Sequence, residues 1–194
     1  LAATTFLATS AYADTPELVV YTYDSFVSDW GPGPVIEKAF EENCACDLKF
    51  VGMGDGPALL ARLTLEGTRS DADIVLGLDT SLIAAAKKTG LFAPTDISAD
   101  YDLPIAWNDE SFIPYDWGYF AFVHNTDLTP PKNFRELGES DVKIIIQDPR
   151  SSTPGLGLLM WVKEAYGNEA PAIWDGLADN IVTVTKGWTE AYGL

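Results

Sequence analysis

Apolar runs alternate with amphipathic segments along the first half of the chain. Three runs have the length and composition of buried strands, namely 18–23, 47–53 and 72–78. Apolar residues recur at helical spacing after each run, which predicts helices over 35–42, 57–65 and 81–89. A strand–helix alternation of this kind is typical of a parallel sheet with helices on both faces. The sequence therefore predicts an α/β fold, in which the run 72–78 is a fully buried strand.

The second half repeats this order after a long stretch without periodicity. Residues 91–114 are predicted to be loops, and 117–124 (WGYFAFVH) to be a strand. Further strands are predicted over 143–147 and 181–185, and helices over 134–139, 155–166 and 170–178. We place the crossover to a second α/β unit near 118–125. The predicted organisation is a first α/β lobe over 14–118 and a second over 119–194, which stops just after Trp188 begins a new element.

The first residues do not have the pattern of a folded element. Residues 1–13 are small and apolar and end in Ala11-Tyr12-Ala13, which has the form of a signal-peptide cleavage site. We interpret them as the remnant of a secretory signal peptide and expect the mature protein to begin near Asp14. Export of this kind predicts a location in the periplasm or outside the cell.

Composition narrows the function classes. The chain is 47% hydrophobic, which is enough to form a core, and its formal net charge is −17. Nucleic acid is an unfavourable partner, because phosphate binding needs a basic face. A cationic small molecule is favoured by long-range attraction, although the same acidity also serves solubility alone.

Few residues are available for catalysis or for metal binding. Cys44 and Cys46 form a Cys-x-Cys pair, which is either joined in a tight disulfide or left as two thiols, and structural or spare thiols are favoured over catalytic ones. The single histidine, His124, lies far away in sequence, so neither a metal site nor a Ser-His-Asp set is predicted. A Gly-rich dinucleotide fingerprint is also missing from the sequence.

Two segments offer aromatic and acidic groups where predicted strands end, which is where open α/β sheets bind ligands. The loop after the first strand has Tyr23 and Trp30 together with Asp24, and rings beside carboxylates suit a cation. Asp55 and Gly56 follow the second strand. Asp55 either caps the next helix or contacts a ligand, and the two roles are compatible.

Two further segments have the same placement in the second half. The loop around Ser152 leads into the 155–166 helix, and hydroxyls at a helix N-terminus either bind an anion or simply cap the helix. Trp188 follows the last strand and a glycine, so it either stacks on a flat or cationic ring or belongs to a core. The four segments together favour a flat, cationic ligand that also carries a phosphate.

These segments resemble one family of proteins. The resemblance runs in order from Leu18 to Leu194 and rests most heavily on VYTYDSFVSDWGPGP and TVTKGWTEAYGL, supported by GDGPALLARL, FIPYDWGYFAFV and QDPRSSTPGLGLLMW. The family is that of periplasmic thiamine-binding proteins, the substrate-binding subunits of bacterial thiamine ABC importers. The Cys-x-Cys pair also fits this family.

The resemblance implies a type II periplasmic binding protein, an α/β fold with two lobes and a ligand cleft between them. It implies capture of thiamine, thiamine monophosphate or thiamine diphosphate and delivery to an inner-membrane permease with its ATPase. It implies no enzymatic activity, no cofactor and no metal. The site residues it implies are Tyr23, Trp30 and Trp188 as aromatic walls, Asp55 and Gly56 as polar contacts, and Ser152 as a contact to the phosphate end.

This sequence departs from the family in its length. Family members continue past this point, so the second lobe is expected to be truncated, and we predict weak or no thiamine binding by residues 14–194 alone. Two rival functions remain open. One is a binding protein of the same fold for another cation, such as ferric iron or a polyamine, and the other is a thiamine-degrading enzyme with a cysteine nucleophile.

Overall fold

The computed structural model describes residues 15–97 and 99–194. The signal peptide predicted over 1–13 lies outside the described residues. The strands are β1 (Glu17–Thr22), β2 (Asp47–Gly52), β3 (Ile74–Val75), β4 (Ile144–Gln147) and β5 (Ile181–Thr185). The α-helices are α1 (Asp24–Val27), α2 (Gly33–Cys44), α3 (Gly56–Glu66), α4 (Ile83–Lys88), α5 (Phe134–Gly138), α6 (Thr153–Tyr166), α7 (Ala170–Leu177) and α8 (Trp188–Tyr192). We call the elements β1 to α4 the first unit and α5 to α8 the second unit.

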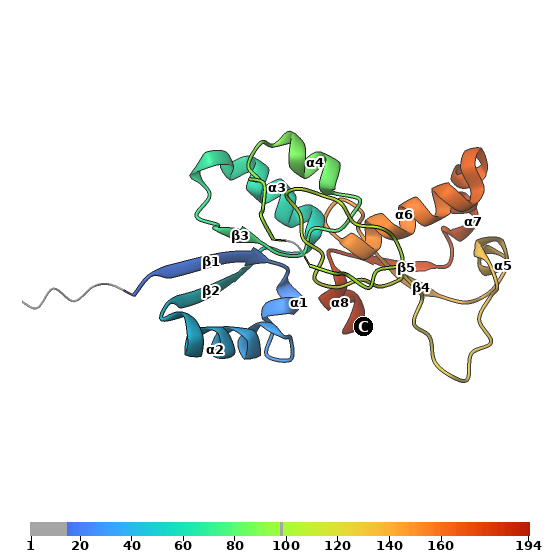
Figure 1. Ribbon diagram of the computed structural model, residues 1–194. Helices are drawn as coiled ribbons and strands as arrows, with labels where there is room; N and C mark the ends of the chain where they lie inside the picture. Colours follow the sequence, from blue (N-terminus) through green and yellow to red (C-terminus); the bar gives the residue numbers. More distant parts are fainter. Residues whose placement is uncertain (1–14, 98) are drawn as a thin grey trace, which may run out of the picture.

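The first unit is built on a three-stranded parallel sheet in the order β2-β1-β3. Helix α2 lies on one side of this sheet, and α3 and α4 lie on the other (Figure 1). Leu59 and Leu63 of α3 pack against Val19 and Tyr21 of β1, which explains the helical spacing of these leucines. The predicted parallel sheet with helices on both faces is thus confirmed for this unit.

The third predicted strand is much shorter than its apolar run suggested. Only Ile74 and Val75 pair with β1, and Ile74 is 46% exposed. The prediction of a fully buried strand over 72–78 is therefore wrong. The reason is that β3 has a neighbour on one edge only among the described residues, so its other edge and one of its faces stay open.

The second unit is built on the parallel pair β4-β5. Helices α5, α6 and α7 cover it with a core of six buried residues, namely Phe134, Leu137, Val162, Ala170, Ile173 and Leu177. Asn180 precedes β5 and is 2% exposed. Its amide donates to the carbonyl of Leu137 in α5 and to those of Ser140 and Val142 in the loop that leads into β4. The predicted strand and helix pattern is confirmed here apart from small shifts of the boundaries.

The two units pack against each other. Leu156 of α6 joins a cluster with Leu60, Leu82 and Ala86 of the first unit. Helix α8 and the end of the chain lie beside α1 near the middle of the molecule (Figure 1). The carboxyl ends of β1, β2, β4 and β5 therefore meet at one junction.

The strand predicted over 117–124 does not form. These residues are neither helix nor strand, and Tyr119 and Val123 are 82% and 91% exposed. An apolar run needs a ladder partner to become a strand, and none of the described strands pairs with it. The described residues between α4 and α5 contain no helix or strand at all, so the division of the chain at 118 and 119 stays a prediction. Within the described ranges, no helix is both long and apolar enough to cross a bilayer.

Candidate functional site

The turn after β1 is fastened to the turn after β2. The backbone N–H of Asp24 donates to the carbonyl of Gly54 at 2.7 Å, and the Asp24 carboxylate accepts from the N–H of Gly54 at 2.8 Å. Gly54 has a φ of +92°, which an L side chain adopts only with strain. This reciprocal pair fixes two strand ends at one place and sets the position of the residues on either side, Tyr23 and Asp55.

Asp55 connects the two units. Its Oδ1 accepts from the N–H of Gly56 at 2.9 Å, which makes Asp55 the N-cap of α3, as predicted. Its Oδ2 accepts from the hydroxyl of Ser152 at 3.0 Å and from the N–H of Thr153 at 3.2 Å. One carboxylate thus caps one helix and also reaches the first residues of another.

Ser152 is fully buried at this contact. Its single hydroxyl hydrogen is shared between two acceptors, Oδ2 of Asp55 and Oε1 of Gln147, the second at 2.5 Å. Its oxygen accepts from the N–H of Gly155, so Ser152 is the N-cap of α6. The capping interpretation is confirmed. Gly56 lies on the opposite side of the junction, where a Cβ would be 2.5 Å from Oγ1 of Thr153. Only a glycine lets the two helix N-termini approach this closely.

Tryptophans from the two units meet at the other end of the junction. The rings of Trp30 and Trp188 have centroids 5.6 Å apart, and Trp188 stacks on Tyr192 at 4.7 Å with an interplanar angle of 13°. Trp30 is 63% exposed, whereas Trp188 is half-buried. Partly exposed indoles of this kind can stack on a flat ring or a cation.

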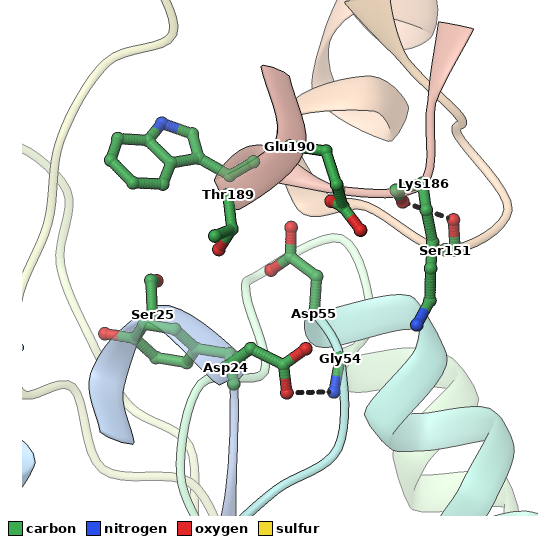
Figure 2. Close-up of a pocket in the computed structure, with 11 residues that line it drawn as sticks. Asp24, Ser25, Gly54, Asp55, Ser151, Lys186, Thr189 and Glu190 are labelled. Atoms are coloured by element: carbon green, nitrogen blue, oxygen red, sulfur yellow. Dashed lines mark hydrogen bonds between the residues drawn. The ribbon is translucent and has the colours of Figure 1, made fainter. Parts of the chain in front are cut away.

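Between these contacts lies a small cavity with a volume of about 20 Å³, which is roughly the room taken by one water molecule. It is lined from both units by Tyr23, Asp24, Ser25, Gly54, Asp55, Ser151, Lys186, Gly187, Trp188, Thr189 and Glu190. Figure 2 shows the carboxylates of Asp55 and Glu190 pointing into the same space. The lining contains three carboxylates, those of Asp24, Asp55 and Glu190, and one ammonium group, that of Lys186, so negative charge is in excess and favours cations.

A much larger groove lies next to this cavity and has a volume of about 1530 Å³. It runs along the open side of β3, the 111–120 segment and α6, and none of the six predicted site residues lines it. Tyr23 and Tyr115 stand between the two spaces, with their hydroxyl oxygens 2.5 Å apart. Burial raises the pKa of both phenols, and Asp116 adds to the effect through its charge, so both remain neutral.

No protein-family model matches this chain. Individual relatives match it closely. It is 55% identical over 97% of its length to the "Thiamine-binding periplasmic protein" of Escherichia coli (strain K12). A solved "Periplasmic thiamin binding protein" superposes with a TM-score of 0.90 at 55% identity, again over 97% of this chain. The chain is a homologue of the thiamine-binding periplasmic proteins.

The resemblance predicted from the sequence is therefore confirmed, and so is the type II periplasmic binding protein fold. A more distant relative, 28% identical over 68% of the chain, is a "Probable ABC transporter periplasmic-binding protein" of Sinorhizobium fredii. The chain spans about three-fifths of the length of the curated thiamine-binding relatives, at 59% of the Escherichia coli protein and 61% of the solved one.

The structure brings the six predicted site residues to one junction. Tyr23, Asp55 and Trp188 line the cavity. Trp30 lies just outside it on the ring of Trp188, and Gly56 and Ser152 lie behind Asp55. The ligand contacts of these six residues stay a prediction.

Three polar groups of the junction were not expected from the sequence. Glu190 and Lys186 flank Trp188 and line the cavity, and Tyr115 bonds to the hydroxyl of Tyr23. Ser151, from the predicted hydroxyl loop before α6, also lines the cavity and donates to the Lys186 carbonyl at 2.6 Å. Glu190 and Lys186 carried a usable signal, since each is within two positions of Trp188 at a strand end. Tyr115 carried none, because its partner is 92 positions away.

The two cysteines are joined in a disulfide, with Cα atoms 5.2 Å apart. They lie at the end of α2 and the start of β2, at the opposite end of the first sheet from the cavity. Of the alternatives left open for this pair, the disulfide is therefore the correct one. The described residues also contain no group of three or more His, Cys, Asp or Glu side chains able to hold a metal ion.

Proposed function

We propose that this chain supplies the ligand-binding junction of a periplasmic solute-binding protein that captures thiamine, thiamine monophosphate or thiamine diphosphate. The observation that carries the proposal is the convergence of Tyr23, Trp188 and three carboxylates on one cavity between two units. That cavity belongs to a homologue, at 55% identity, of a protein named for thiamine binding.

The chemistry of thiamine fits the groups at this junction. Thiamine carries a cationic thiazolium ring, and a cation over an aromatic face gains about 0.5–2 kcal/mol per good contact. Tyr23, Trp30 and Trp188 supply those faces, and Asp55 and Glu190 supply negative charge. Gly56 allows a ligand to approach its backbone closely once Thr153 has moved away from it. Ser152 caps α6, whose N-terminus favours the negative charge of a phosphate ester.

Ligand entry requires the two walls of the cavity to separate. The present volume, about 20 Å³, accommodates a water molecule, whereas small-molecule pockets have volumes of about 300–1000 Å³. A ligand that enters here must replace the contacts of Asp55 with Ser152 and Thr153, or those of Trp30 with Trp188. Hinge opening between two units is the usual way in which such clefts admit ligands.

Delivery and location follow from the same proposal. The protein acts in the periplasm after cleavage of the signal peptide predicted over 1–13, and it passes its ligand to an inner-membrane permease and its ATPase. It needs no cofactor and catalyses no reaction. The relatives are named as binding proteins, and the disulfide between Cys44 and Cys46 leaves neither thiol free as a nucleophile.

Another cation on the same fold is less well supported. A ferric site would use phenolates, but burial and nearby carboxylates raise the pKa of Tyr23 and Tyr115 and favour the neutral phenols. A polyamine has no flat ring to place between Trp30 and Trp188. The aromatic walls therefore favour an organic ring cation.

The test is calorimetric titration of two proteins with thiamine, its two phosphates, ferric citrate and spermidine. One protein is this chain. The other is a chimera that joins it to the part of the Escherichia coli relative that this chain does not match. Saturable binding of thiamine compounds alone, by the chimera or by both proteins, supports the proposal. Binding of another cation, or no binding of thiamine by either protein, contradicts it.

A further inference from the structure

The ring of Tyr23 is held on two sides by the first unit. Its face packs over the backbone of Gly77, so closely that a Cβ at this position would lie 2.2 Å from Cδ1 of the tyrosine. Gly77 has a φ of +104°, which also favours glycine. The edge of Phe26 meets the ring at a centroid distance of 5.6 Å and an interplanar angle of 73°. These contacts set the plane of the ring, and neither of them involves its hydroxyl.

The tip of Tyr23 is held from a different segment. The hydroxyl of Tyr115 lies 2.5 Å from that of Tyr23, and Tyr115 belongs to the 111–120 segment that lines the large groove. That segment is neither helix nor strand, so its own position depends on side-chain contacts such as the packing of Phe120 over Gly157 of α6. Tyr115 thereby links the groove wall to the cavity wall.

We infer that Tyr115 is a positioning residue for the ligand site: its hydroxyl fixes the ring of Tyr23 in the orientation that faces the cavity. The inference rests on the proposed function, because it assigns Tyr115 to the same thiamine-binding junction. Tyr115 itself lines the groove and not the cavity, so it acts through Tyr23. The phenol–phenol bond orders the wall before the ligand arrives, and preorganisation of this kind strengthens binding.

The binding test is a double-mutant cycle on Tyr23→Phe and Tyr115→Phe, measured with thiamine on whichever of the chain and the chimera binds it. Loss of one hydrogen bond predicts weakening by roughly two- to ten-fold for Tyr115→Phe. In the Tyr23→Phe background, the same substitution should have no further effect. Tyr119→Phe is the matched control, because Tyr119 lies in the same segment and contacts Trp117 instead. A Tyr115→Phe protein that binds like wild type, or two effects that simply add, would overturn the inference.

A second readout does not depend on thiamine. In the ligand-free chain with ¹³C-labelled tyrosine rings, the Tyr23 resonance is assigned by its loss in Tyr23→Phe. It should shift in Tyr115→Phe and stay in place in Tyr119→Phe. An unmoved resonance sinks the positioning role whatever the protein binds. A shifted resonance in a protein that fails to bind thiamine keeps the positioning role and discards the proposed ligand.

Discussion

The Asp55 carboxylate accepts a hydrogen bond from the Ser152 hydroxyl at 3.0 Å, across 97 positions of sequence and between two separate sheets. Ser152 is fully buried, so this is a contact of the interior and not of a mobile surface. Each of the two residues also caps a helix, α3 for Asp55 and α6 for Ser152. The helix caps of the two units are therefore coupled, and a ligand that engages Asp55 acts on both.

This coupling predicts non-additive stability changes. Asp55→Ala and Ser152→Ala should each lower the free energy of unfolding by about 1–3 kcal/mol, since each removes a cap and a buried hydrogen bond. The double mutant should lose clearly less than the sum of the two, by about 1 kcal/mol. Urea unfolding of the four proteins measures this difference.

Asp79→Ala is the control for that cycle. Among the described residues, the Asp79 carboxylate accepts from Ser81 in its own turn. The stability lost in Asp79→Ala should therefore add to the stability lost in Ser152→Ala. If the stability losses of Asp55→Ala and Ser152→Ala also add, the hydrogen bond between the two units is absent in solution.

The close approach at Gly56 predicts a steric effect with a specific rescue. In Gly56→Ala, the new methyl group would lie 2.5 Å from Oγ1 of Thr153 and should lower the thermal midpoint of unfolding. Thr153→Ala removes that oxygen, which is buried and has no hydrogen-bond partner among the described residues, so the double mutant should regain much of the lost stability. Gly176→Ala is the control. Gly176 lies in α7 with open space around it, so this substitution should raise the free energy of unfolding by about 0.5–1 kcal/mol. A Gly56→Ala protein as stable as wild type would show that the helix ends are further apart.

The contacts of Asn180 predict a large loss of stability when this residue is replaced, at a position away from the ligand junction. Its amide donates to the carbonyls of Leu137, Ser140 and Val142 at 2.8–2.9 Å. Asn180→Ala removes this donor from the carbonyls of Ser140 and Val142, whereas the Leu137 carbonyl still accepts from the N–H and hydroxyl of Ser140. The substitution should cost about 2 kcal/mol of unfolding free energy in chemical denaturation. Asn180→Asp has the same shape but presents oxygens to the carbonyls, so it should cost more. If Asn180→Ala costs no more than the surface substitution Asn125→Ala, the network does not stabilise the second unit.

The local part of this architecture was readable from the sequence. Asp55 and Ser152 were placed correctly as helix caps, because a cap depends on the few residues that follow it. The positions of Tyr23 and Trp188 after strands were also correct, since strand ends follow from the apolar runs. The resemblance to known proteins added the ligand class.

The errors and omissions concern contacts between distant segments. The apolar run 117–124 reads as a strand, but a strand needs a partner, and the sequence cannot show whether an edge is available. Ile74 was expected to be buried for the same reason. The bond between Tyr23 and Tyr115 depends on how a long segment without regular structure packs on the first unit, which no local pattern encodes.

The ion pair in the loop before α6 predicts a lowered pKa for Asp148, which NMR can measure. The Arg150 guanidinium beside Asp148 lowers the pKa of that carboxyl to about 2. Because the folded-state pKa is depressed, the interaction contributes stability above the ordinary value of about 3.9 and loses it as the pH falls toward 2. In Arg150→Gln, NMR titration should show the pKa of Asp148 raised toward the ordinary value, while the backbone N–H of residue 150 still lowers it. Arg62→Gln, which removes the partner of Glu66 instead, should leave Asp148 unchanged. An unshifted pKa in Arg150→Gln would mean that the pair is not formed in solution.

Thiamine binding where Trp30 and Trp188 meet is tested most directly by tryptophan fluorescence. Thiamine is titrated into this chain and into the chimera, as wild type, Trp188→Phe and the control Trp161→Phe, whose indole packs on Phe134 in the second unit. For the chimera, we predict saturable quenching in the wild type and in Trp161→Phe, with most of the amplitude lost in Trp188→Phe. Quenching that is unchanged in Trp188→Phe would place the ligand elsewhere, and no saturable quenching in any of the proteins would contradict thiamine binding at this junction.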